Sequence, residues 1–234
     1  GFLTWKDMAE KKWDFHRYRL QSKMILSATL LLVLLPALFY FFVEFRGRSF
    51  PERILASFFT AVTPRTAGFN TVDFTKFSDS GLFLQILLML VGAAPGSTGG
   101  GMKITTMSVL LLTSVAIFKN SLRTEAFGRT IPGDVIRNAT TIAFMYLVLC
   151  ILSGMFISLY EKVPLLSACY ETASAIATVG LTLGITPSLR PVSHLLLIAL
   201  MYIGRVGGLC LIYAVFPNAN PDRGSLVEEK VNVG

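Results

Sequence analysis

GAAPGSTGGGMK, from Gly92 to Lys103, separates two strongly apolar runs, GLFLQILLMLV and ITTMSVLLLTSVAIF. Glycines, a proline and hydroxyl side chains are unexpected in the middle of a stretch that otherwise resembles one membrane-spanning helix. Two explanations compete: a loop whose backbone amides cradle a phosphate, and a helix that is broken inside the bilayer. The rest of the sequence decides between them.

A phosphate-binding loop of the Walker type requires the pattern G-x-x-x-x-G-K-[ST] immediately after a strand. Gly96 and Gly101 have the required spacing, but Met102 follows them and Lys103 comes one position late. The preceding apolar run is also longer than a usual buried strand. The pattern therefore favours a broken helix.

The composition predicts an all-α membrane protein. Hydrophobic residues make up 53% of the chain and charged residues 15%, whereas a soluble domain carries about 25% charged residues. The uncharged runs Met24–Val43 and Asn138–Tyr160 have the length of roughly 20 residues that crosses a bilayer. Leu82–Met102 and Pro191–Phe216 are also long enough, although each is interrupted. We therefore expect four spans.

The distribution of basic residues predicts the orientation. With four spans, residues 1–23, residues 119–137 and the C-terminal tail lie on one side of the membrane. Twelve of the 21 Lys and Arg residues fall on that side, against seven on the other. The positive-inside rule then places both termini in the cytoplasm. The net charge of +7 needs no nucleic acid to explain it.

The chain repeats itself at a distance of 112 residues, so that Ala56 aligns with Ala168, Gly68 with Gly180 and Gly92 with Gly204. Each repeat starts with an uncharged span, followed by a short apolar segment, Pro51–Thr63 or Pro164–Ala177. At a rise of 1.5 Å per residue these segments are about 20 Å long as helices, too short to cross the bilayer. We expect two tandem units of the form span, pore helix, loop, span.

The loop after each short segment is the predicted ion-binding element. Irregular backbone at membrane depth is tolerated only where it is buried or lines water, and dehydrated cations bind backbone carbonyls in the TVGYG loops of potassium channels. The candidate filter residues are Thr66, Ala67, Gly68, Phe69 and Asn70 in the first unit and Thr178, Val179, Gly180, Leu181 and Thr182 in the second.

Arginine at position 205 aligns with Ala93, which places a fixed charge beside the opened loop of the first unit. A charge at mid-membrane costs about 2.5–3.5 kcal/mol on insertion scales, so it normally has a partner. We expect Arg205 to hold the loop by its carbonyls and to slow ion passage; a purely structural hydrogen bond is the alternative. Glu171 is expected to brace the second filter or to pair with Arg65.

Four motifs carry a resemblance to a known family: TPRTAGFNTVDF, GAAPGSTGGGMKITT, ATVGLTLGITPSL and GRVGGL. They look like the third and fourth repeats of the Trk/Ktr/HKT potassium transporter superfamily, and the ending VEEKVNVG resembles KtrB-type membrane subunits. Members carry four such units around one pore, so the resemblance implies the C-terminal half of such a protein. It also implies a gate at the broken helix, formed by Gly92, Ala93, Ala94, Pro95, Gly96, Ser97, Thr98, Gly99, Gly100 and Gly101.

The resemblance further implies how the chain is divided. Residues 1–22 would form a cytosolic or interfacial helix, 23–118 the third repeat, 119–217 the fourth, and 218–234 a cytosolic tail. The implied partners are the first two repeats, a second copy in a homodimer, and a cytosolic nucleotide-binding regulatory subunit, KtrA-like or TrkA-like.

The expected function is potassium transport, not enzymatic catalysis, in the plasma (inner) membrane. No bound cofactor is expected; potassium would be held by the filter carbonyls alone, with sodium as a candidate activator. Sodium or mixed transport by the same fold, and a non-conducting membrane scaffold, stay open as alternatives.

Overall fold

The helices of this chain follow the two-unit order predicted from the repeat. The structure is a computed structural model that describes residues 1–12, 14–121 and 123–207. The helices are α1 (Phe2–Lys11), α2 (Leu20–Val43), α3 (Phe50–Val62), α4 (Asp79–Leu90), α5 (Ile104–Phe118), α6 (Gly133–Glu161), α7 (Leu165–Ile176) and α8 (Pro191–Val206). Three short 3-10 turns, η1 (Phe15–Arg17), η2 (Phe74–Lys76) and η3 (Thr186–Ser188), lie in the connections. The predicted tail at 218–234 and the end of the last span lie outside the described residues.

Helices α2 and α6 are each long and apolar enough to cross a membrane. Both begin a few residues before the uncharged runs that predicted them. The backbone amide of Arg19, the residue before α2, donates to Asp7, and Pro132 precedes α6. A proline pre-sets the backbone at a helix start without removing a needed amide bond. The ends of these helices are therefore set by local capping rather than by hydropathy.

The break in the second predicted span is longer than the glycine pattern predicts. The sequence suggests that the helix opens at Gly92 and resumes at Met102, whereas α4 ends at Leu90 and α5 begins at Ile104. Val91 and Met102 form a parallel bridge, and the amide of Gly92 donates to the carbonyl of Met102 at 2.8 Å. These groups pair across the neck of the loop instead of continuing either helix.

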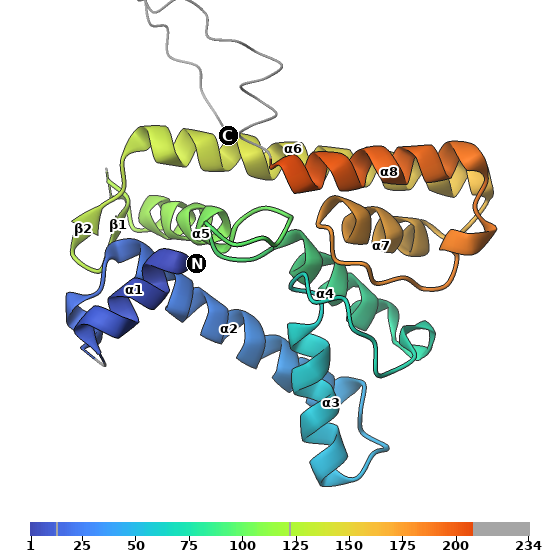
Figure 1. Cartoon of the computed structure of the whole chain (residues 1–234), viewed down its shortest axis with the longest axis horizontal. Helices are drawn as coiled ribbons and strands as arrows, with labels where there is room; N and C mark the ends of the chain where they lie inside the picture. Colours follow the sequence, from blue (N-terminus) through green and yellow to red (C-terminus); the bar gives the residue numbers. More distant parts are fainter. Residues whose placement is uncertain (13, 122, 208–234) are drawn as a thin grey trace, which may run out of the picture.

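The two short helices are packed very differently. Helix α7 lies among α4, α6 and α8, whereas α3 packs mainly against α2 at the edge of the molecule (Figure 1). The fully buried Tyr170 of α7 donates to Gln85 of α4 at 2.7 Å and so links the two units. Leu55 on α3 is 72% exposed. Helix α7 is thus enclosed, whereas α3 presents an apolar face.

A short hairpin between α5 and α6 was not predicted. Strands β1 (Glu125–Ala126) and β2 (Arg129–Thr130) pair antiparallel around Phe127 and Gly128. Both turn residues have positive φ, which Gly128 adopts without strain. Two-residue strands give too short a pattern for period-two alternation to reveal them.

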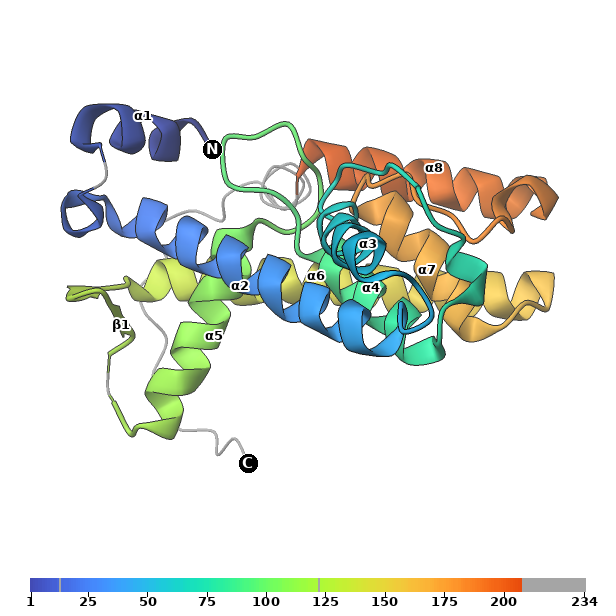
Figure 2. The ribbon, with the colours of Figure 1, turned by 90° about the horizontal axis from the view of Figure 1, so that it is seen from below.

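Helix α1 is fastened to α2 by one carboxylate. Asp7 is fully buried and accepts hydrogen bonds from the hydroxyl of Ser22 at 2.7 Å and the amide of Arg19 at 3.0 Å. Lys11 pairs with it at 3.0 Å. In Figures 1 and 2 the start of α1 lies beside the loop between α4 and α5.

We expect acid to release α1 from α2. Burial alone raises the pKa of Asp7, but the hydrogen bonds from Ser22 and Arg19 and the Lys11 charge outweigh it and lower this pKa to about 2. A carboxyl whose folded pKa is depressed stabilises the docked state above its unfolded value of about 3.9. That stabilisation is lost as the pH falls through 4 toward 2.

Spin labels on α1 and α2 measure this release as a longer inter-label distance. The distance should stay constant from pH 7 to pH 5 and lengthen below pH 4. Asp7→Asn should lengthen it already at pH 7, and Glu10→Gln, which changes an exposed carboxylate on the same helix, should not. An unchanged distance in Asp7→Asn would contradict the anchoring role.

Candidate functional site

The loops that follow α3 and α7 meet at one point. A Cβ built on Gly68 would lie 2.1 Å from the carbonyl oxygen of Val179, so only glycine permits this approach. The repeat places the two loops in equivalent positions, with Gly68 aligned to Gly180, and the structure brings Gly68 of one loop against Val179 of the other. One continuous site is formed by both units.

The two loops share an unusual backbone conformation. Thr66 has φ 61° and Gly68 φ 74°, while Thr178 has φ 53° and Gly180 φ 90°. A residue other than glycine in this region costs on the order of 1–3 kcal/mol, and such strain clusters at functional sites. The same strain at the equivalent threonine of each repeat indicates that this loop shape has a functional role.

Both loops contain a run of backbone carbonyls without a hydrogen-bond donor. Three consecutive carbonyl oxygens in each loop, those of Thr66, Ala67 and Gly68 and those of Thr178, Val179 and Gly180, accept none of the hydrogen bonds described for residues 1–12, 14–121 and 123–207. The amides are satisfied instead, since Gly68 donates to Thr63 and Val179 to Ser174. Such a set of fixed oxygens, without donors of its own, can replace the water shell of a cation.

The last two residues of the predicted filter segments have different surroundings in the two units. Phe69 is 72% exposed, and its carbonyl accepts from the hydroxyl of Thr63. Asn70 uses its side chain to cap the amide of Val72 at 3.1 Å. In the second unit Leu181 is buried and Thr182 donates to Glu171 at 2.6 Å.

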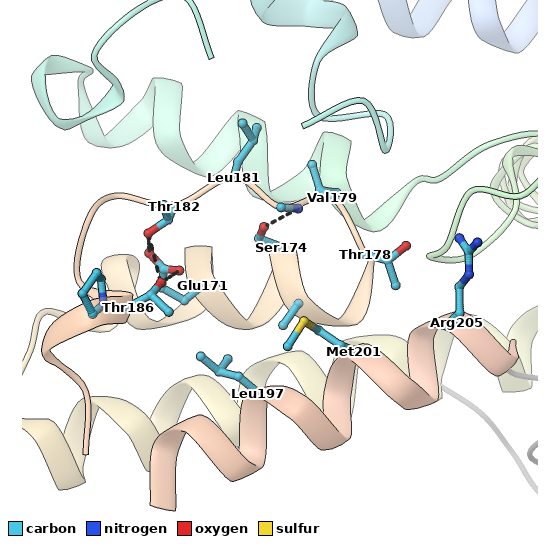
Figure 3. A pocket seen from close by; sticks show the side chains of 13 residues that line it. Glu171, Ser174, Thr178, Val179, Leu181, Thr182, Thr186, Leu197, Met201 and Arg205 are labelled. Atoms are coloured by element: carbon cyan, nitrogen blue, oxygen red, sulfur yellow. Dashed lines mark hydrogen bonds between the residues drawn. The ribbon is translucent and has the colours of Figure 1, made fainter. Parts of the chain in front are cut away.

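Glu171 braces the second loop, which is one of the two roles predicted for it. It also accepts hydrogen bonds from the amide of Leu183 at 2.9 Å and the hydroxyl of Thr186 at 2.6 Å (Figure 3). The alternative, an ion pair with Arg65, is wrong: among the described ion pairs neither residue has the other as partner. Both oxygens of Glu171 are used by the loop that follows its own helix.

The broken-helix loop lies directly against the loops that follow α3 and α7. A Cβ on Gly99 would lie 2.6 Å from the hydroxyl of Thr66, and one on Gly100 would lie 2.2 Å from the hydroxyl of Thr178. The hydroxyl of Thr178 is buried and has no hydrogen-bond partner. The backbone of Gly99 and Gly100, without side chains, therefore covers both threonines.

Three cationic side chains hold the loop by its carbonyls. Arg205 donates to Thr98, Lys103 donates to Gly99 at 2.6 Å, and Arg65 donates to Gly92 at 3.3 Å. The first contact is the one predicted from the repeat. Sequence reasoning missed the role of Arg65, because nothing local indicates a bond to a residue 27 positions away.

A cavity of about 630 Å³ runs alongside the second loop. Leu197, Met201 and Arg205 of α8 line one side, and the loop from Thr178 to Thr182 lines the other (Figure 3). Gly180 is exposed there, while the side chains of Val179 and Leu181 are buried. The cavity thus connects the carbonyl-lined loop to the arginine that holds the broken helix.

Replacing Glu171 by Gln should loosen the second filter loop. A glutamine offers one acceptor oxygen where the carboxylate uses two, so at least one of the three bonds is lost. A hydrogen bond to a charged group is worth about 1.5–3 kcal/mol. We expect lower thermal stability and a lower preference for potassium over sodium in tracer uptake by the full-length protein. Glu52→Gln, at an exposed carboxylate of α3, controls for charge; equal selectivity in Glu171→Gln and wild type would contradict the bracing role.

Comparison with known proteins identifies the family. A family model described as "Cation transport protein", TrkH, matches residues 17–220. The chain is 40% identical over 232 residues to the potassium/sodium uptake protein NtpJ of Enterococcus hirae, covering 94% of this chain and 51% of that protein. It is 33% identical over 220 residues to the Ktr system potassium uptake protein B of Bacillus subtilis, covering 92% and 49%.

A solved structure shares the fold. The potassium transporter TrkH from Vibrio parahaemolyticus superposes with a TM-score of 0.73 at 21% identity, covering 92% of this chain and 49% of that one. The chain spans about half the length of the relatives that it matches. The repeat, the family match and these relatives agree: this chain belongs to the TrkH family of cation transport proteins, which are transporters and not enzymes.

Proposed function

We propose that this chain supplies two of the four repeats that surround a potassium-conducting pore. The observation that carries the proposal is the set of six unpaired carbonyl oxygens on two touching loops of equal conformation. A single turn with free carbonyls has ordinary explanations. Two such turns in contact, each after a short helix and each strained at a threonine, fit a cation filter.

The path of an ion follows from the order of these parts. A cation enters from outside, loses water to the carbonyls of both loops, and meets the backbone of Gly99 and Gly100. The broken-helix loop acts as the gate, and its glycines permit the movement that opens it. Arg205 holds the closed position through Thr98 and opposes a cation at close range. The membrane potential contributes about 2.3 kcal/mol per charge per 100 mV.

The proposal includes the division of the chain and its surroundings. Residues 23–118 and 119–217 act as the third and fourth repeats, after an interfacial segment at 1–22 and before a cytosolic tail at 218–234. The first two repeats would close the open side of the cavity. A second copy and a cytosolic nucleotide-binding subunit complete the assembly in the plasma membrane, with both ends of this segment in the cytoplasm.

Sodium or mixed transport is a second candidate. The relative from Enterococcus hirae carries both ions in its name. The two loops described here have glycine at both positions 68 and 180, and we therefore favour potassium. The loops of the other two repeats contribute equally to selectivity.

Rubidium tracer uptake into vesicles that contain the full-length protein tests this function. We expect uptake that potassium inhibits at lower concentration than sodium. Equal inhibition by both ions would support the mixed transporter. No uptake in the presence of the cytosolic subunit and its nucleotide would contradict conduction and favour a membrane scaffold.

A further inference from the structure

A second cavity, of about 250 Å³, lies between α2 and α5 and is independent of the filter. Ala28, Leu31 and Met107 are among its lining residues, and Phe127 of the hairpin closes one end. Two serines also line it, but their hydroxyls are bound to their own helices: Ser27 donates to Lys23 at 2.8 Å, and Ser108 donates to Ile104 at 2.8 Å. The cavity therefore offers an occupant hydrocarbon contacts and almost no polar ones.

The rim of this cavity is open toward the hydrophobic surroundings of the helices. Leu31 is 53% exposed and Leu111, opposite it on α5, is 52% exposed. Exposed leucines flank the same part of α2, at Leu30 and Leu34. Because α2 is long and apolar enough to span a bilayer, a groove along it is accessible to an acyl chain.

The end of the groove next to Phe127 carries a positive charge. The ammonium group of Lys23 lies 5.7 Å from the ring centre of Phe127 and 5.8 Å from that of Phe15. It donates to the carbonyl of His16 at 2.9 Å, and it has no carboxylate partner among the described ion pairs. An ammonium group has three donors, so two are available to a further acceptor.

We propose that the groove between α2 and α5 binds an anionic phospholipid of the cytoplasmic leaflet. Its acyl chain occupies the apolar cavity, and Lys23 binds its headgroup phosphate. The rings of Phe15 and Phe127 flank the ammonium group of Lys23 and so hold it at this end of the groove. The assignment to the cytoplasmic leaflet rests on the orientation proposed above, in which basic segments face the negatively charged inner surface.

Native mass spectrometry of the full-length protein in mild detergent tests this site. Phosphatidylglycerol and phosphatidylcholine with identical acyl chains are titrated separately. We expect phosphatidylglycerol to bind more tightly to the wild type. Lys23→Gln should reduce that preference about fivefold, which is the contribution of one basic residue near an anionic membrane surface. Lys119→Gln, at the exposed end of α5, should leave the preference unchanged.

Filling the groove provides the second arm of the test. Ser108→Phe places a ring inside the cavity and should reduce the binding of both lipids, whereas Ser114→Phe, on the exposed face of α5, should not. Equal headgroup preference in Lys23→Gln and wild type would overturn the proposal. Undiminished lipid binding in folded Ser108→Phe would also overturn it. A wild-type protein that retains no lipid, because another part of the full-length protein covers the groove, would overturn it as well. All of these experiments measure lipid binding and none measures transport. A failure of the lipid proposal can therefore be distinguished from a failure of the proposed transport function.

Discussion

Gly68→Ser should lower the preference for potassium over sodium by at least about tenfold. A side chain at this position meets the carbonyl oxygen of Val179 at 2.1 Å, which is backbone and has to shift. It also has to adopt φ 74°, at a cost of roughly 1–2 kcal/mol for an L-residue. About 1.4 kcal/mol corresponds to tenfold in an equilibrium constant. The displaced carbonyls no longer match the ion that the wild-type filter selects.

Competition between potassium and sodium for rubidium uptake measures this loss. Gly180→Ser separates backbone strain from steric clash. Its φ is 90°, so a side chain is strained there, but a Cβ would meet nothing within 4 Å. It should produce a smaller loss of selectivity. Gly47→Ser, with open space and an ordinary φ, is the matched control. Wild-type selectivity in folded Gly68→Ser would contradict the filter assignment.

Arg205→Ala should speed uptake about tenfold or more. The side chain donates to the carbonyl of Thr98 and so fastens the gating loop to α8. A hydrogen bond from a charged group is worth about 1.5–3 kcal/mol, and its removal favours the open loop by that amount. The same substitution removes a fixed positive charge from the cavity beside the second loop, which in our proposal is part of the path of the ion.

Two further variants separate the two effects of Arg205, which are the bond that holds the loop and the repulsion of the ion by its charge. Arg205→Lys keeps the charge but offers a compact ammonium in place of the planar guanidinium, so it should release the loop only in part. Lys103→Gln removes the bond to Gly99 from the loop's own helix and should have a smaller effect. An unchanged uptake rate in folded Arg205→Ala would show that the contact is only structural.

The repeat predicted the most consequential parts of the site. It aligned Gly68 with Gly180 and set Arg205 beside the loop, and the structure brings these residues to the same region. The contact between Gly68 and Val179 was not predictable, because a repeat gives equivalence but not the distance between the two units. The bond from Arg65 to Gly92 and the pairing of Tyr170 with Gln85 depend on tertiary packing, which no local pattern encodes.

Helix limits were the least predictable feature. Hydropathy predicted four spans, whereas among the described residues two helices, α2 and α6, are long enough to cross a membrane and α4, α5 and α8 are shorter. The bridge between Val91 and Met102 moved the break outward by a residue or two at each side. Hydropathy also treats the two short helices alike, although α7 is enclosed and α3 is exposed along one face. The difference follows from what surrounds them: α7 has α4, α6 and α8 around it, and α3 has mainly α2.

The central claim is that the carbonyls of the two touching loops bind the ion. Crystals of the full-length protein grown with rubidium in place of potassium test it through the anomalous scattering of that ion. We predict a peak in direct contact with the carbonyl oxygens of Gly68 and Gly180, which weakens when sodium replaces rubidium. A protein that transports rubidium but shows its anomalous peaks only elsewhere along the pore would contradict the account.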